Sequence, residues 1–180
     1  MRKHIFRLST LFIITLSSVS FSANSSVDNS STAQSSATNS ANLVKATSFS
    51  LPGVAGQQVS LDDYSGKVVF IDFWASWCTP CIRSFPWMNK MIDNYSDDDF
   101  AVIAINMDQD PELAKKFLQR YPNKMTIAFD PNGTVAELYE VMGLPNSFIL
   151  NKEGEIAYKH VGFRLKDVDN YEAEIKSLLN

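Results

Sequence analysis

The stretch KVVFIDFWASWCTPC, residues 67–81, carries the features that decide the fold of this chain. Residues 67–73 form a nearly continuous apolar run, which is typical of a strand buried on both faces of a sheet. The only two cysteines, Cys78 and Cys81, follow at C-x-x-C spacing, and apolar residues then recur every three or four positions, as in a helix. A dithiol at such a strand-to-helix junction is typical of a pair that opens and closes a disulfide.

The position of the two cysteines predicts a different task for each. Cys78 would lie at the start of the helix, where unpaired amides and the helix dipole stabilise a thiolate. Cys81, one turn later, would resolve the mixed disulfide that Cys78 forms with a substrate. Two other interpretations are weaker. A static disulfide across so short a loop adds little stability, and two cysteines supply half of the ligands that a structural zinc ion needs.

The rest of the sequence predicts an α/β fold around a central mixed sheet. Apolar runs predict four more strands in that sheet, at 100–106, 126–129, 147–150 and 156–161. A short strand pair is expected before the central strand, from residues 49–51 and 59–61. Amphipathic patterns predict a helix that carries Ile82 to Tyr95 and further helices at 111–120, 134–139 and 168–179. This order is a βαβ unit followed by an αββα end, with helices flanking the sheet.

The first 42 residues predict two segments outside the folded domain, which is expected to span residues 43–180. Residues 1–22 join three basic residues to an apolar stretch and end in small residues, the pattern of a secretory signal peptide. An uncleaved membrane anchor is the alternative. Residues 23–42 are rich in Ser, Asn and Ala and predict a disordered linker. We therefore expect a periplasmic or otherwise extracytoplasmic protein.

The net charge of the protein and its expected location outside the cytosol limit the kinds of partner that it can have. The chain has 16 Lys and Arg against 20 Asp and Glu, and removal of residues 1–22 would leave 13 against 20, a net charge of −7. Such an acidic protein is not expected to bind nucleic acid. Outside the cytosol, a catalytic dithiol also needs a dedicated partner that supplies or removes electrons.

The segment from Asp72 to Cys81 resembles the active-site segment of the thioredoxin family. Pro86 matches the proline that kinks the active-site helix of that family, and residues 143–150 (GLPNSFIL) resemble the segment with its cis-proline. The early strand pair, the run at 84–86 and the secretion signal are similar to those of the exported TlpA/ResA-like members. The resemblance covers roughly residues 45–180 and depends on the combination of Trp-Cys-x-x-Cys with a distant proline.

This resemblance implies a thioredoxin-like fold with an extra N-terminal strand pair. It implies that Pro145 is cis beside the cysteines and that the Leu144 backbone pairs with a bound substrate. Trp74 and Trp77 flank the cysteines and either shape a substrate platform or pack as a wall. The implied activity is cofactor-free reduction of disulfides in specific extracytoplasmic proteins, with apocytochrome c as one substrate class. A membrane thiol protein would donate the electrons, and we expect a monomer.

Two positions depart from the family pattern. Many TlpA/ResA-like proteins carry a Glu where this chain has Ser84, and the lysine that accompanies the buried carboxylate of thioredoxins aligns with Ala104. The carboxylate itself is kept as Asp72. Burial without a cation would raise the pKa of Asp72 and let it exchange a proton with Cys81. The alternative is an Asp held by local hydrogen bonds at the end of a strand.

Two other functions remain open from the sequence. A copper(I) carrier could use both thiolates with His160 as a soft three-ligand site, although copper carriers of this fold typically have a longer cysteine gap. A thiol peroxidase would need Thr or Ser three residues before the reactive cysteine, and that position is Ala75. Thiol-disulfide exchange is therefore the preferred prediction.

Overall fold

A computed structural model describes residues 43–180 of the chain. The predicted signal peptide and linker lie outside the described residues. Within residues 43–180, none of the helices combines the length and the apolar character needed to cross a membrane.

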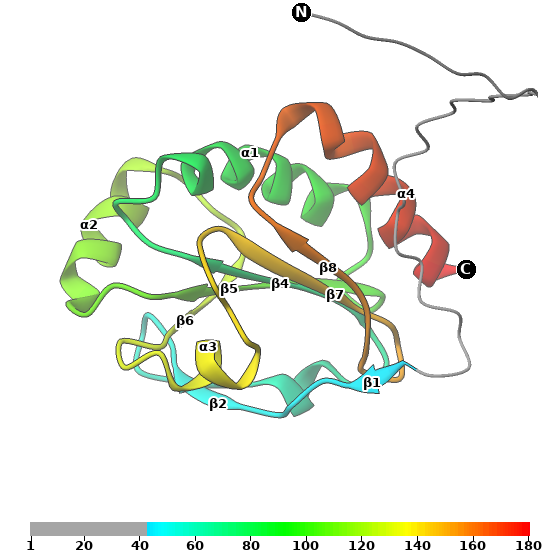
Figure 1. Cartoon of the computed structure of the whole chain (residues 1–180), viewed down its shortest axis with the longest axis horizontal. Helices are drawn as coiled ribbons and strands as arrows, with labels where there is room; N and C mark the ends of the chain where they lie inside the picture. The colour runs from blue at the N-terminus through cyan, green and yellow to red at the C-terminus, as the bar shows by residue number, and fades with distance from the viewer. Residues whose placement is uncertain (1–42) are drawn as a thin grey trace, which may run out of the picture. The chain divides into compact units, whose positions relative to one another are not determined.

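A six-stranded mixed sheet forms the centre of the fold (Figure 1). Its strand order is β1-β8-β7-β4-β5-β6. The strands β4, β5 and β6 are parallel, whereas β7 is antiparallel to β4 and β8 is antiparallel to both β7 and β1. The sheet strands are β1 (Val44–Lys45), β4 (Val68–Trp74), β5 (Phe100–Asn106), β6 (Thr126–Phe129), β7 (Asn146–Leu150) and β8 (Glu155–Val161).

Helices and a small hairpin cover the two faces of this sheet. One face packs against α1 (Thr79–Asn94), α2 (Pro111–Arg120) and α4 (Val168–Leu179). The other packs against α3 (Thr134–Leu138) and the antiparallel pair β2 (Ser50–Pro52) and β3 (Gln58–Ser60), with short 3₁₀ turns at Leu61–Tyr64 and Leu165–Asp167. Because successive strand residues point to opposite faces, alternate residues of β4 enter the two separate apolar clusters.

The predicted central strand, helices and strand pair are confirmed. The strands at 100–106 and 126–129 and the helices at 111–120 and 168–179 have the expected bounds. The active-site helix begins earlier than its apolar pattern, at Thr79, and the other elements differ by one residue. The sequence analysis did not predict β1, a two-residue strand on the edge of the sheet whose residues are both exposed. So short and exposed a strand leaves no hydrophobic pattern to detect.

Candidate active site

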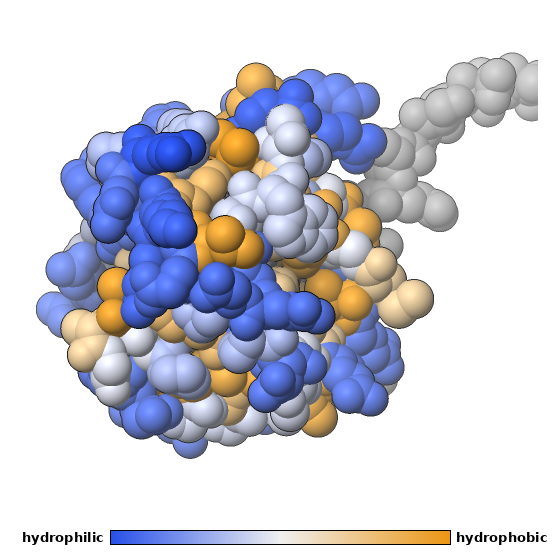
Figure 2. Space-filling model, turned by 90° about the vertical axis from the view of Figure 1, so that its left-hand side faces the viewer, coloured by the Kyte–Doolittle hydropathy of each residue, from blue (hydrophilic) through white to orange (hydrophobic). Residues whose placement is uncertain are grey.

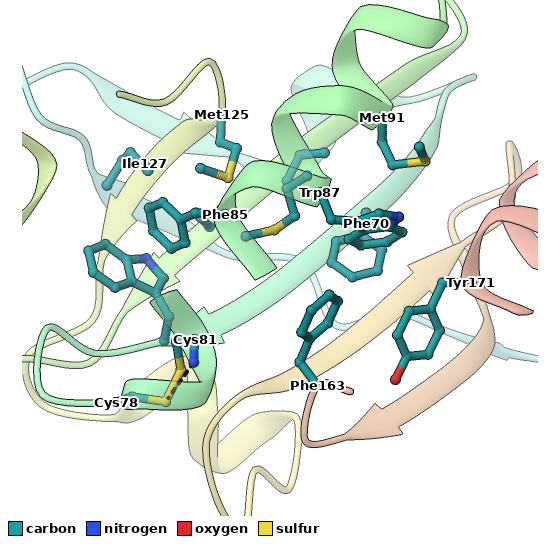
Figure 3. Close-up of a cluster of buried hydrophobic side chains, with 14 of the residues drawn as sticks. Phe70, Cys78, Cys81, Phe85, Trp87, Met91, Met125, Ile127, Phe163 and Tyr171 are labelled. Carbon is teal, nitrogen blue, oxygen red and sulfur yellow. Dashed lines mark hydrogen bonds between the residues drawn. A yellow bond between two sulfur atoms is a disulfide. The ribbon is translucent and has the colours of Figure 1, made fainter. Parts of the chain in front are cut away.

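Cys78 and Cys81 form a disulfide at the start of α1, directly after the loop that follows β4 (Figure 3). Their Cα atoms are 5.3 Å apart. Cys78 is the N-cap residue of the helix, and its sulfur accepts a hydrogen bond from the Cys81 amide at 3.3 Å. Cys78 keeps 4% of its surface exposed and Cys81 none. A substrate therefore meets Cys78 first, at the helix end where a thiolate is stabilised.

The first turns of α1 are anchored in the apolar core. Phe85 packs edge-to-face on Trp74 of β4, with ring centroids 4.9 Å apart. Pro86 lies inside the helix, as the family resemblance implies. The hydroxyl of buried Ser84 donates to the Cys81 carbonyl at 2.8 Å. The position at which many relatives carry an acid is therefore occupied here by a side chain that only bonds the backbone.

Asp108 fixes the loop between β4 and the cysteines. Its carboxylate accepts hydrogen bonds from the amide and the hydroxyl of Ser76, both at 3.0 Å, and from Nδ2 of Asn106 at 2.9 Å. Asp108 is buried. The sequence analysis missed this residue. A signal for it existed, because it follows β5, and the carboxyl ends of parallel strands β4 and β5 lie at the same edge of the sheet.

Asp72 lies in the middle layer of the molecule, on the face of β4 that α1 and α4 cover. Its neighbours across the sheet are Ala104 on β5 and Ser147 on β7. The side chain is 2% exposed, and no group within residues 43–180 hydrogen-bonds its Oδ2 atom. Burial raises the pKa of Asp72 well above its ordinary value. The predicted pKa direction is confirmed, and local hydrogen bonds do not hold this oxygen.

The segment with the cis-proline offers backbone groups that a substrate could bind. The Leu144–Pro145 peptide bond is cis, as the resemblance implies, and the Pro145 carbonyl accepts from the Gly162 amide at 2.8 Å. Leu144 is half-buried, and its backbone groups have no partner within the described part of the chain. These free groups are what pairing with an extended substrate requires.

The two tryptophans of the active-site segment have different surroundings. Trp74 is fully buried and packs as a wall, whereas Trp77 is 70% exposed beside Cys78. The side of the molecule on which β4 leads into α1 shows apolar residues in separate patches among hydrophilic ones (Figure 2). Trp77 is thus the tryptophan that remains available as a substrate contact.

Comparison with known proteins agrees with this geometry. The model of the AhpC/TSA family matches residues 44–159. The chain belongs to the AhpC/TSA family. It is 32% identical to the thiol-disulfide oxidoreductase ResA of Bacillus thuringiensis subsp. konkukian, over 68% of this chain and 71% of that protein.

Solved structures place this AhpC/TSA domain among thioredoxin-like folds. A Chlorobium tepidum protein named as thiol:disulfide interchange protein DsbE is 46% identical, with a TM-score of 0.74 over 77% of this chain and 97% of that one. StoA from Bacillus subtilis is 23% identical, with a TM-score of 0.61 over 72% and 96%, and shows the fold alone. With the Cys78–Cys81 pair, these relatives show that the chain is a TlpA/ResA-like thiol-disulfide oxidoreductase acting on protein thiols.

The copper(I) alternative lacks its third ligand in this fold. Nε2 of His160 lies 2.6 Å from a carboxylate oxygen of Glu174. Across residues 43–180, the structure brings together no group of three or more His, Cys, Asp or Glu side chains that could hold a metal ion. His160 is therefore a strand residue with a partner on α4 and does not complete a site with the two cysteines.

Proposed function

We propose that this protein is an exported reductant of protein disulfides, in which Cys78 attacks and Cys81 resolves. The observation that supports this proposal most strongly is that Cys78 is the N-cap residue of α1 and forms a disulfide with Cys81. In the reduced state the Cys78 thiolate attacks a substrate disulfide and releases one substrate thiol. Cys81 then attacks the sulfur of Cys78, which releases the second substrate thiol and closes the Cys78–Cys81 disulfide.

The reducing direction is supported by how few groups stabilise the Cys78 sulfur. Strong oxidants of this fold owe their high potential to a strongly stabilised thiolate in the reduced form. Here the only hydrogen bond to the sulfur from residues 43–180 comes from the Cys81 amide. Pro80, in the first turn, has no amide to add. One amide at the helix end gives the thiolate modest support, which favours the disulfide state and makes the dithiol a reductant.

Asp72 is proposed to take the proton of Cys81 when that thiol attacks. Burial raises the pKa of this carboxyl, so it accepts a proton more readily than an ordinary Asp does. Its side chain points to the layer that contains α1, where Cys81 is fully buried. Trp77, Leu144 and Pro145 would hold the substrate chain on the other side of Cys78.

The setting of this reaction is inferred from the sequence. Residues 1–22 would direct export, a membrane thiol protein would return electrons to the disulfide, and the protein would act as a monomer. Apocytochrome c is the substrate class we favour. A peptide with an oxidised Cys-x-x-Cys-His sequence tests this, since the protein should reduce it faster than a peptide whose two cysteines are flanked by unrelated residues.

The reduction potential of the Cys78/Cys81 couple tests the direction. Equilibration with defined thiol buffers should give a value nearer that of thioredoxin, about −270 mV, than that of DsbA, about −120 mV. A value close to −120 mV would contradict the proposal. The Cys81→Ser variant is the control, because it leaves no pair to oxidise.

A further inference from the structure

A row of polar side chains crosses the sheet from the buried Asp72 toward the surface. In the strand register, Asp72 on β4 faces Ser147 on β7, and Ser147 faces His160 on β8. Facing residues of antiparallel strands project to the same side, with Cβ atoms roughly 4.5–5.5 Å apart. His160 then contacts Glu174 of α4 at 2.6 Å. The row therefore consists of four neighbouring polar residues, in the order Asp72, Ser147, His160 and Glu174.

Exposure increases along this row from Asp72 to His160. Asp72 is 2% exposed and Ser147 is 7% exposed, while the side chains of His160 and Glu174 are 20% and 12% exposed. The row thus begins in the core and ends where water reaches it. A buried carboxyl that must gain and lose a proton in each catalytic cycle needs such a path.

Tyr171 covers the row from α4. The centroids of the Tyr171 and His160 rings are 4.5 Å apart, and the Tyr171 ring also packs close to Phe163 (Figure 3). Burial raises the pKa of Tyr171, the charges of Asp167, Glu174 and Asp72 raise it further, and Arg164 lowers it. The carboxyls of Asp72 and Glu174 therefore both raise the pKa of the Tyr171 hydroxyl. This agrees with the short distances between neighbouring residues of the row that the strand register predicts.

The first three members of the row, Asp72, Ser147 and His160, each have capacity for a further hydrogen bond. Oδ2 of Asp72 has no partner among the described residues, and within them neither the Ser147 hydroxyl nor Nδ1 of His160 is bonded. A serine hydroxyl both donates and accepts, and a neutral imidazole accepts at one nitrogen while it donates at the other. Rotation of the Ser147 side chain can direct its hydroxyl toward either neighbour.

We propose that Ser147, His160 and Glu174 form the route by which the Asp72 carboxyl exchanges its proton with solvent. This inference rests on the proposed function, in which Asp72 receives the Cys81 proton. As the Cys78–Cys81 bond forms, the substrate sulfur leaves with the electron pair of its broken bond. The proton then passes from Asp72 to the Ser147 oxygen while the Ser147 proton passes to His160. His160 releases a proton to water or to Glu174.

The test compares the rate of disulfide exchange in four variants by stopped-flow fluorescence. Ser147→Ala and His160→Gln should each slow the resolving step on the order of tenfold, whereas Asp72→Asn, which removes the direct proton acceptor, should slow it by about 10²–10⁴. Ser147→Thr keeps a hydroxyl and should match the unaltered protein. Imidazole in the buffer should restore the rate of His160→Gln, which loss of structure alone would not allow. Unfolding curves check that each variant is folded.

Other results of this experiment would contradict the proton route, the role of Asp72 or the proposed function, each in a distinguishable way. If Asp72→Asn is slow but Ser147→Ala and His160→Gln exchange at the unaltered rate, the route is wrong and Asp72 keeps its role. If Asp72→Asn is also unaffected, both the proton role of Asp72 and the route are wrong. If the unaltered protein reduces no disulfide, the proposed function itself fails.

Discussion

Replacement of Asp72 by Asn is expected to stabilise the protein at neutral pH. The carboxyl is 2% exposed, Oδ2 lacks a partner within residues 43–180, and burial raises its pKa. The folded protein therefore binds this proton more tightly than the unfolded chain, whose Asp has a pKa of about 3.9. The contribution of Asp72 to stability is fully present below that pH and is lost as the pH rises toward the folded-state pKa.

The size of the gain follows from the cost of ionising a buried carboxyl. An unsatisfied buried group costs about 1–3 kcal/mol, and a charged one costs more. Asn has nearly the same shape but its amide is also an unsatisfied buried group, so Asp72→Asn should gain only the cost of ionising the carboxyl. By pH 7 that cost is about 1.4 kcal/mol for each unit by which burial raises the pKa. For a domain of this size, each kcal/mol corresponds to a rise of about 2–4 °C in Tm. The difference between the two proteins should shrink as the pH falls toward about 4.

Urea unfolding of the oxidised proteins, followed by circular dichroism at several pH values, measures this difference. Asp108→Asn is the matched control. It is an equally buried Asp, but its carboxylate accepts three hydrogen bonds, so its replacement should destabilise the protein at pH 7. A loss of stability in Asp72→Asn at pH 7, or a difference that does not change with pH, would refute the reasoning.

Three further substitutions test other parts of the site. Trp77→Ala should lower kcat/KM for a protein disulfide about tenfold and leave the free energy of unfolding within roughly 0.5 kcal/mol, since Trp77 is 70% exposed. Ser84→Glu should destabilise the protein by more than about 2 kcal/mol in urea unfolding, because the new carboxylate would be buried without a partner. Asp130→Ala should cost roughly 2–4 kcal/mol, because Asp130 accepts three amides at the start of α3, each at 2.9 Å.

The sequence was sufficient for the elements that have strong local patterns. The apolar run before Cys78 indicated a buried strand, and the pair Asp110-Pro111 marked the start of α2, where the Asp110 side chain accepts from the Glu112 amide. The cysteine pair and Pro145 were found from motifs of a few residues. Such signals are local, so one chain contains all the information needed to read them.

The interactions that join distant segments could not be predicted in the same way. Asp108 holds Ser76 across 32 positions of sequence, and the row from Asp72 to His160 exists only because β7 lies between β4 and β8. The sequence analysis considered His160 as a copper(I) ligand, whereas its place opposite Ser147 depends on a strand register that no periodicity reveals. These contacts arise from topology, which local patterns constrain weakly.

The most direct test of the central claim is to locate the mixed disulfide. Cys81→Ala, reduced and mixed with an oxidised substrate protein, should trap a stable adduct, and mass spectrometry should place the bond at Cys78. Cys78→Ala should trap little or none, because Cys81 is fully buried. Equal trapping through Cys81, or no adduct in either variant, would contradict the assignment of Cys78 as the attacking cysteine.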